Sequence, residues 1–197
     1  MPHTETPFSQ AIFKMFDNLD SSLLKNNADL SNEGEAIRVY LFGGCAVHLH
    51  IGSRVTNDVD AELKKISKLP IDELLIKPVT FKNDQGLRKS LYLDRNFDKS
   101  LASIDPEYED RAIFLYTTKF KLVSIYLVSA VDIAVSKLSR FEINDRQDIK
   151  NLYLQGLFTS KEFQDVASEA HSYCAVAPDK LLLNIRQALE MIEEVSK

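Results

Sequence analysis

Apolar residues recur at helical spacing at the start of the chain, and strand-like runs follow them. The first helix is predicted from five apolar residues spaced three or four apart, which are Phe8, Ile12, Phe16, Leu19 and Leu23. This spacing gives the helix one apolar face, and the polar run at residues 25–35 ends it. We therefore expect an amphipathic helix that packs against the rest of the fold.

Short runs of β-branched and aromatic residues predict a sheet in the middle of the chain. Residues 36–42 form a buried strand, and the double glycine Gly43 and Gly44 turns that strand sharply into a short helix. The segment Asp-Val-Asp is a further strand. Beyond it, strands are predicted at residues 72–81 and 90–94, with the turn NDQG between them, and one or two more at residues 111–129.

From residue 130 onward every pattern is helical. Thr159 and Glu162 have the spacing of a capping box, and the last helix has an apolar stripe of Leu182, Ile185, Leu189 and Ile192. The order of elements predicts an α/β or α+β fold, a mixed sheet flanked by helices with a helical C-terminal half. We expect a sheet domain at residues 1–128 and a helical lobe at residues 129–197, packed together as one compact unit.

Composition and charge exclude some kinds of protein. With 197 residues and 45% hydrophobic content, the chain can build one full core. A net charge of -5 argues against coating nucleic acid or anionic membrane through the overall field, although a local basic patch stays open. No basic and apolar leader begins the chain and no run is apolar enough for a membrane span, so a cytoplasmic protein is expected. Cys45 and Cys174 are expected to be buried thiols and provide no zinc site.

Two aspartates on one strand are the strongest candidate for chemistry. Asp58 and Asp60 flank Val59, so in a strand both carboxylates point to one side and Val59 to the other. At a separation of about 5 Å and an effective dielectric near 20, their repulsion is roughly 3 kcal/mol, which calls for a positive partner. Mg²⁺, or Mn²⁺, fits because it takes oxygen ligands and completes its shell with substrate phosphates. A solvated strand end is the alternative.

The double glycine strengthens the metal interpretation. Glycine at a helix start lets the backbone approach a ligand, and the free amides there attract phosphate. A double glycine by itself is often only a tight turn, but the order strand, glycine turn, helix, Asp-x-Asp strand is more specific. Because the chain contains neither GxxxxGK(S/T) nor GxGxxG, P-loop and dinucleotide folds are excluded.

The stretch FGGCAVHLHIGSRVTNDVDAEL resembles the signature of the minimal nucleotidyltransferase superfamily. The segments RVTNDVD, LYLDRNF, DPEYEDRAI and VDIAVSKLSRFEINDRQDI resemble uncharacterised bacterial nucleotidyltransferase-like proteins, which are distantly similar to the toxins of abortive-infection toxin–antitoxin systems. The resemblance covers residues 36–155. It implies a nucleotidyltransferase-like fold with a site for a nucleotide and two magnesium ions.

The resemblance also implies roles for individual residues. Gly43 and Gly44 would hold the nucleotide phosphates, and Asp58 and Asp60 would bind metal together with a third carboxylate on a neighbouring strand. Asp94 is our choice for that third carboxylate, because Leu91 and Leu93 would face the core and leave Ser90, Tyr92 and Asp94 on the opposite face. Alternatively, Asp94 only ends a strand.

Charged and polar residues outside the strands are further candidates. Arg54 and Thr56 lie in the loop before the metal strand, within reach of a phosphate; the alternative for Arg54 is an exposed loop arginine. The toxin-like relatives suggest nucleotide-binding or catalytic roles for Lys137 and Asp148, whereas the alternative is an ion pair joining two helices. The secondary candidates are Asp132, Arg140 and Arg146.

The sequence thus predicts a magnesium-dependent nucleotidyltransferase that moves a nucleoside monophosphate from an NTP onto a hydroxyl of a tRNA, a protein or a small molecule. By resemblance it would act as a toxin in phage defence, held by an antitoxin-like protein. The alternative is a catalytically inactive nucleotide-binding or partner-binding module on the same fold.

Overall fold

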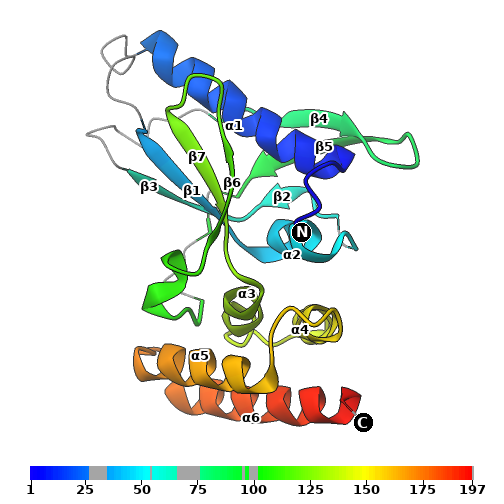
Figure 1. The fold of residues 1–197 in the computed structure, drawn as a ribbon, viewed down its shortest axis with the longest axis vertical. Coiled ribbons are helices and arrows are strands. Elements are labelled where there is room, and N and C mark those ends of the chain that lie inside the picture. Colours follow the sequence, from blue (N-terminus) through cyan, green and yellow to red (C-terminus); the bar gives the residue numbers. More distant parts are fainter. Residues whose placement is uncertain (27–34, 54, 66–75, 95, 98–101, 197) are drawn as a thin grey trace. The chain divides into compact units, whose positions relative to one another are not determined.

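The structure is a computed structural model that falls into two compact units (Figure 1). Unit 1 comprises Met1–Phe97 and Ile113–Leu127, and unit 2 comprises Asp98–Ala112 and Val128–Lys197. Each unit is described by itself. The described residues are 1–26, 35–53, 55–65, 76–94, 96–97 and 102–196.

A four-stranded mixed sheet forms the centre of unit 1. Its strand order is β3 (Ala61–Lys65), β1 (Ile37–Leu41), β7 (Val123–Leu127) and β6 (Ile113–Thr117). β1 runs parallel to β7, and the two outer pairs are antiparallel. As an inner strand, β1 is covered almost completely, which explains why its sequence is a nearly continuous apolar run. The predicted α/β class is confirmed.

A second sheet contains β2 (Asp58–Val59), β5 (Arg88–Leu93) and β4 (Val79–Lys82), in that order. β2 is parallel to β5, and β4 and β5 form an antiparallel hairpin through the predicted NDQG turn. The strand predicted at residues 72–81 is wrong at its start, because residues 76–78 are not extended in a ladder; residues 72–75 lie outside the described residues. Pro78 has no N–H to donate, so pairing begins only after it.

Helix α1 (Pro7–Asn26) packs against β4 and β7. All five apolar residues predicted for its inner face are buried, and the rings of Phe8 and Phe81 lie 5.9 Å apart. The helix also buries Asp20, whose carboxylate accepts hydrogen bonds from the backbone N–H groups of Phe120 at 2.7 Å and Leu122 at 3.1 Å. These amides belong to the turn between β6 and β7, so a buried carboxylate fixes that turn.

Unit 2 contains the helices that were predicted from residue 130 onward. Its helices are α3 (Ala130–Ser136), α4 (Ile143–Leu154), α5 (Ser160–Ser172) and α6 (Pro178–Val195), with a 3₁₀ turn η4 at Pro106–Glu109. The capping box at α5 is confirmed, since the Thr159 hydroxyl accepts from the Glu162 amide at 3.1 Å and the Glu162 carboxylate accepts from the Thr159 amide at 2.7 Å. None of the described helices has both the length and the apolar character that a membrane span requires.

The apolar stripe predicted for α6 is partly wrong. Ile185 and Ile192 are buried, but Leu182 is 36% exposed and Leu181 occupies the inner face instead. Asn184 also lies on the inner face, where its side-chain amide donates a hydrogen bond of 2.8 Å to the Leu138 carbonyl. A buried amide needs such a partner, and the hydrogen bond exists only after folding.

Candidate active site

The glycine turn closes one side of the candidate site. Phe42 is extended and caps helix α2 (Gly43–Ile51), which starts as predicted. Gly43 has φ +57°, and a Cβ at this position would lie 1.7 Å from Oδ2 of Asp60. Any other residue would be strained and would collide with this carboxylate. Gly43 therefore makes room for Asp60 at the start of the helix, besides turning the chain.

Asp60 lies where the chain passes from one sheet to the other. It follows β2 and precedes β3, and its carbonyl accepts a hydrogen bond of 2.8 Å from the Phe42 amide. This bond ties the residue before the glycine turn to the backbone of Asp60. The N-terminus of α2 and the Asp60 carboxylate are thus held together by main-chain geometry.

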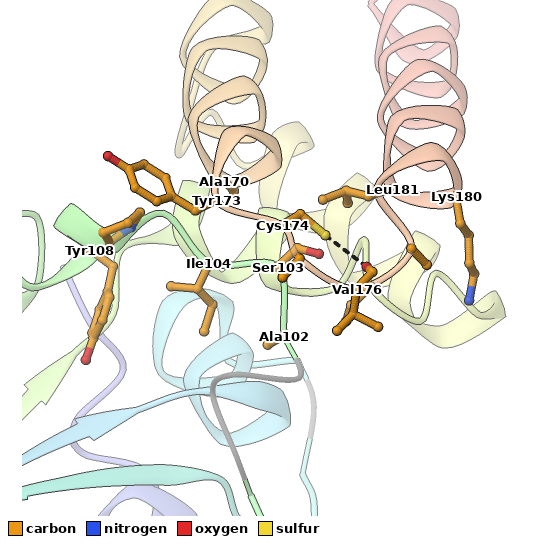
Figure 2. Close-up of a pocket in the computed structure, with 14 residues that line it drawn as sticks. Ala102, Ser103, Ile104, Tyr108, Ala170, Tyr173, Cys174, Val176, Lys180 and Leu181 are labelled. Atoms are coloured by element: carbon orange, nitrogen blue, oxygen red, sulfur yellow. Dashed lines mark hydrogen bonds between the residues drawn. The ribbon is translucent and has the colours of Figure 1, made fainter.

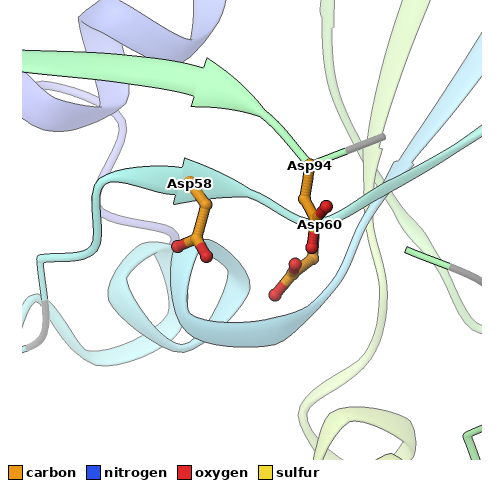
Figure 3. Close-up of side chains that lie close together, drawn as sticks. All are labelled: Asp58, Asp60 and Asp94. Carbon is orange, nitrogen blue, oxygen red and sulfur yellow. The ribbon is translucent and has the colours of Figure 1, made fainter. Parts of the chain in front are cut away.

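Three carboxylates converge at this point, as Figure 3 shows. Asp58, Asp60 and Asp94 each place one oxygen within 4.8 Å of the other two, and all three side chains are half-buried. Val59 is fully buried behind them, so the predicted alternation of Asp58, Val59 and Asp60 is confirmed. Asp94 joins them because its amide donates to the Val59 carbonyl at 2.9 Å, which extends the β2 and β5 ladder by one residue.

Neighbouring groups orient two of the carboxylates. The Thr56 hydroxyl donates a hydrogen bond to Oδ1 of Asp58, and Oδ1 of Asp94 accepts from the Asn96 amide at 2.8 Å. Thr56 thus contacts the metal-site candidate directly, while its predicted contact with a phosphate stays a prediction. Arg54, predicted beside it, lies outside the described residues.

The donor chemistry of the cluster fits a hard divalent cation. All three side chains offer carboxylate oxygen, which is the ligand type of Mg²⁺ and Mn²⁺, and the partial exposure leaves room for substrate oxygens. Cys45, the nearest thiol on α2, is not part of this donor set. Burial, followed by the charge of Asp60, raises the pKa of the Cys45 thiol, so it stays protonated and donates to the Phe42 carbonyl at 3.0 Å.

Lys137 and Asp148 lie in unit 2, and they pair there as predicted. Nζ of Lys137 is 2.7 Å from Oδ2 of Asp148 and 3.5 Å from Oδ1 of Asp145. The side chain of Lys137 is only 6% exposed and that of Asp148 only 7%. Arg140 adds two hydrogen bonds of 2.8 Å to Asp145. Burial acts to raise the pKa of Asp145, but the Arg140 hydrogen bond and the Lys137 charge outweigh it and hold that pKa below its usual value.

The secondary candidates make contacts inside unit 2. Asp132 is fully buried and pairs with Arg111, which also reaches Asp105 at 2.7 Å. Arg146 donates to the Phe141 carbonyl at 3.1 Å and stacks over the Phe141 ring. Arg111 was not among the predicted residues, although it lies in DPEYEDRAI. Through Asp132 it joins the segment before β6 to α3.

Unit 2 also contains a pocket of about 640 Å³ that the sequence did not indicate (Figure 2). It lies at the end of α5 and the start of α6, and small and apolar side chains form most of its wall. Cys174 lines it and is only half-buried, so the expectation of a buried thiol is wrong for this residue; its thiol donates to the Val176 carbonyl at 3.0 Å. No carboxylate occurs among the described residues of the wall, so the pocket does not suit a divalent cation.

The family model described as nucleotidyltransferase of unknown function (DUF6036) matches residues 16–195. The chain belongs to this family. The match includes the glycine turn and all three carboxylates of this DUF6036 protein, and it confirms the predicted nucleotidyltransferase relationship. A search of curated proteins finds no match, and the similarity to abortive-infection toxins stays a prediction.

Proposed function

We propose that this DUF6036 protein is a magnesium-dependent nucleotidyltransferase that transfers a nucleoside monophosphate from an NTP to a hydroxyl group. The observation that carries the proposal is the convergence of Asp58, Asp60 and Asp94 within 4.8 Å of one another, directly beside the glycine turn that begins α2. An oxygen-only metal site next to the positive end of a helix is what a triphosphate substrate requires.

The three carboxylates would hold Mg²⁺, with Mn²⁺ as the substitute. When bound, the ion would supply Lewis-acid activation of the phosphoryl group and stabilise the pyrophosphate that leaves. Family membership supports the reaction class. The partial exposure of the carboxylates supports access for both substrates.

The chain's own residues would bind and orient the reactants. The amides of Gly43 and Gly44, in the first turn of α2, would bind phosphate oxygens, and Arg54 would add a forked contact. The acceptor oxygen attacks the α-phosphorus, the bond to pyrophosphate breaks, and the hydroxyl proton passes to a carboxylate of the Asp58 and Asp60 pair. Thr56 would keep Asp58 in the orientation this step needs.

Titration calorimetry with each NTP, with and without Mg²⁺, tests the binding half of the proposal. A transfer assay with α-phosphate-labelled NTPs and separate RNA, protein and small-alcohol acceptors tests the chemistry. We expect magnesium-dependent binding of at least one NTP and transfer of label to one acceptor class. Binding without transfer to any acceptor would instead establish the inactive nucleotide-binding module, and no NTP binding at all would overturn both.

Replacement of Lys137 is expected to destabilise the protein strongly. Lys137→Met leaves the buried Asp148 carboxylate without its partner at 2.7 Å, and breaking a buried pair in this way typically costs about 3–5 kcal/mol. Urea unfolding of the variant and of the wild type measures the difference in free energy. A loss below about 1 kcal/mol would contradict the buried pair, because exposed pairs contribute only that much.

A double variant separates a structural role of this pair from the nucleotide-binding role that we also propose for Lys137 and Asp148. Lys137→Met with Asp148→Leu removes both charges, so most of the lost stability should return. If the pair contributes to nucleotide binding, the stable double variant should still bind NTP at least about tenfold more weakly, the scale of one charge-assisted hydrogen bond. Unchanged affinity would make the pair purely structural.

A further inference from the structure

The outer face of the hairpin formed by β4 and β5 is polar and exposed. Val79 and Leu91 are buried and Phe81 lies against Phe8 of α1, so these residues form the inner face. The alternate positions face outward and are exposed. We call these outward residues the β4–β5 strip, which consists of Thr80, Lys82, Arg88, Ser90 and Tyr92.

The strip leads directly to the carboxylate cluster. Tyr92 is the register partner of Asp58 in the parallel pair of β5 and β2, so the two side chains share a face. Asp94 follows two residues later on the same face. From Arg88 to Asp94 the strand rises about 20 Å at roughly 3.3 Å per residue. An extended ligand that lies along the strip would therefore have one end at the proposed metal site.

The far end of the strip is cationic. Lys82 and Arg88 are directly opposite one another beside the turn, and like charges in such positions destabilise a hairpin. Within the part of the chain that the structure describes, neither side chain forms an ion pair. Asp84 is the acidic residue of the turn between them. In a chain of net charge -5, two facing cations indicate an anionic ligand.

The near end of the strip is aromatic. Tyr92 is 48% exposed, although burying an aromatic ring against the fold would be favourable. An exposed ring beside a row of hydroxyl and cationic side chains is the combination that binds single-stranded nucleic acid, because bases stack on the ring and phosphates lie on the cations. Thr80 and Ser90, between the two ends, can donate hydrogen bonds to phosphate or sugar oxygens.

We propose that the β4–β5 strip binds the acceptor and that the acceptor is a single-stranded nucleic acid. The backbone phosphates lie on Lys82 and Arg88, a base near the strand end stacks on Tyr92, and the terminal hydroxyl reaches Asp58 and Asp94. This assignment rests on the proposed nucleotidyl transfer, since it identifies the class of hydroxyl that receives the nucleotide.

Fluorescence anisotropy with a labelled single-stranded RNA of about 12 nucleotides, within the usual range of site sizes, tests the strip without NTP or metal. Lys82→Gln with Arg88→Gln should raise the dissociation constant at least about tenfold. The same change should lower the slope of log K against log salt by about 1.4, because each phosphate that is no longer neutralised accounts for about 0.7. Tyr92→Ala should weaken binding about tenfold, whereas Tyr92→Phe keeps the ring and should bind like the wild type.

Lys14→Gln with Lys25→Gln is the matched control, because it removes the same charge from exposed positions on α1. Equal weakening in this control, no effect of the strip variants, or no RNA binding by the wild type would each overturn the proposal. Label transfer to a protein or small alcohol without RNA binding would overturn it while leaving the nucleotidyltransferase function intact. RNA binding through the strip without any NTP binding would contradict the proposed function, and with it the acceptor role, while leaving the strip as a surface that binds single-stranded RNA.

Discussion

Asp60→Asn is expected to abolish magnesium-dependent label transfer, by more than about a hundredfold, while the midpoint of thermal unfolding stays at the wild-type value or rises. The loss follows because Asp60 is one of three carboxylates within 4.8 Å and direct metal ligands matter at least as much as their supporting partners. The retained stability follows because removing one of three adjacent negative charges relieves their repulsion. Transfer assays and thermal melts of the same preparation measure both quantities.

Asp179→Asn is a suitable control, since Asp179 is an exposed acidic residue in the first turn of α6. This variant should transfer label at the wild-type rate. A large loss of thermal stability in Asp60→Asn would mark Asp60 as a structural residue of the turn into β3. Normal transfer in Asp60→Asn would remove the cluster from the chemistry.

Gly43→Ala is expected to reduce both Mg²⁺ affinity and transfer by more than about tenfold, the scale of disturbing a metal ligand's orientation. The added Cβ would lie 1.7 Å from Oδ2 of Asp60, so the carboxylate must leave its present position. The positive φ of +57° adds about 1–2 kcal/mol of backbone strain. Calorimetric titration with Mg²⁺ and urea unfolding separate the effect on the site from the effect on stability.

Gly156→Ala provides the matched comparison. Gly156 has a similar φ of +67° but open space where its Cβ would stand. Its alanine variant should lose a similar amount of stability, about 1–2 kcal/mol, from backbone strain and keep full metal affinity and transfer. If Gly43→Ala and Gly156→Ala behave alike in the metal titration, the glycine turn is only a turn and its proximity to Asp60 has no role in the site.

Local sequence patterns predict part of the candidate site. Asp58 and Asp60 could be assigned to one face because a strand alternates with a period of two, and burial of Val59 bears this out. The helix after the double glycine and the five inward residues of α1 follow from equally local rules. Such features depend on backbone geometry within a few residues, so the sequence by itself determined them.

Other parts of the site depend on contacts between distant segments. Asp94 joins the cluster only because β5 pairs with β2 in the observed register. This pairing joins two segments that are far apart in the sequence, and spacing along the chain does not encode its register. Likewise, the double glycine indicated a turn, but only the tertiary structure shows the Asp60 carboxylate where a Gly43 side chain would be.

The difference between local patterns and tertiary contacts also explains why the prediction for α6 was partly wrong. The sequence determined that α6 is amphipathic, but tertiary contacts decided that Leu181 and Asn184 face inward and Leu182 outward. Similarly, the position of Asp20 in α1 follows from the sequence, but only folding brings the amides of Phe120 and Leu122 to its carboxylate. Helices and strands follow from local conformational preference. The hydrogen-bond partner of a buried polar group depends on the fold as a whole.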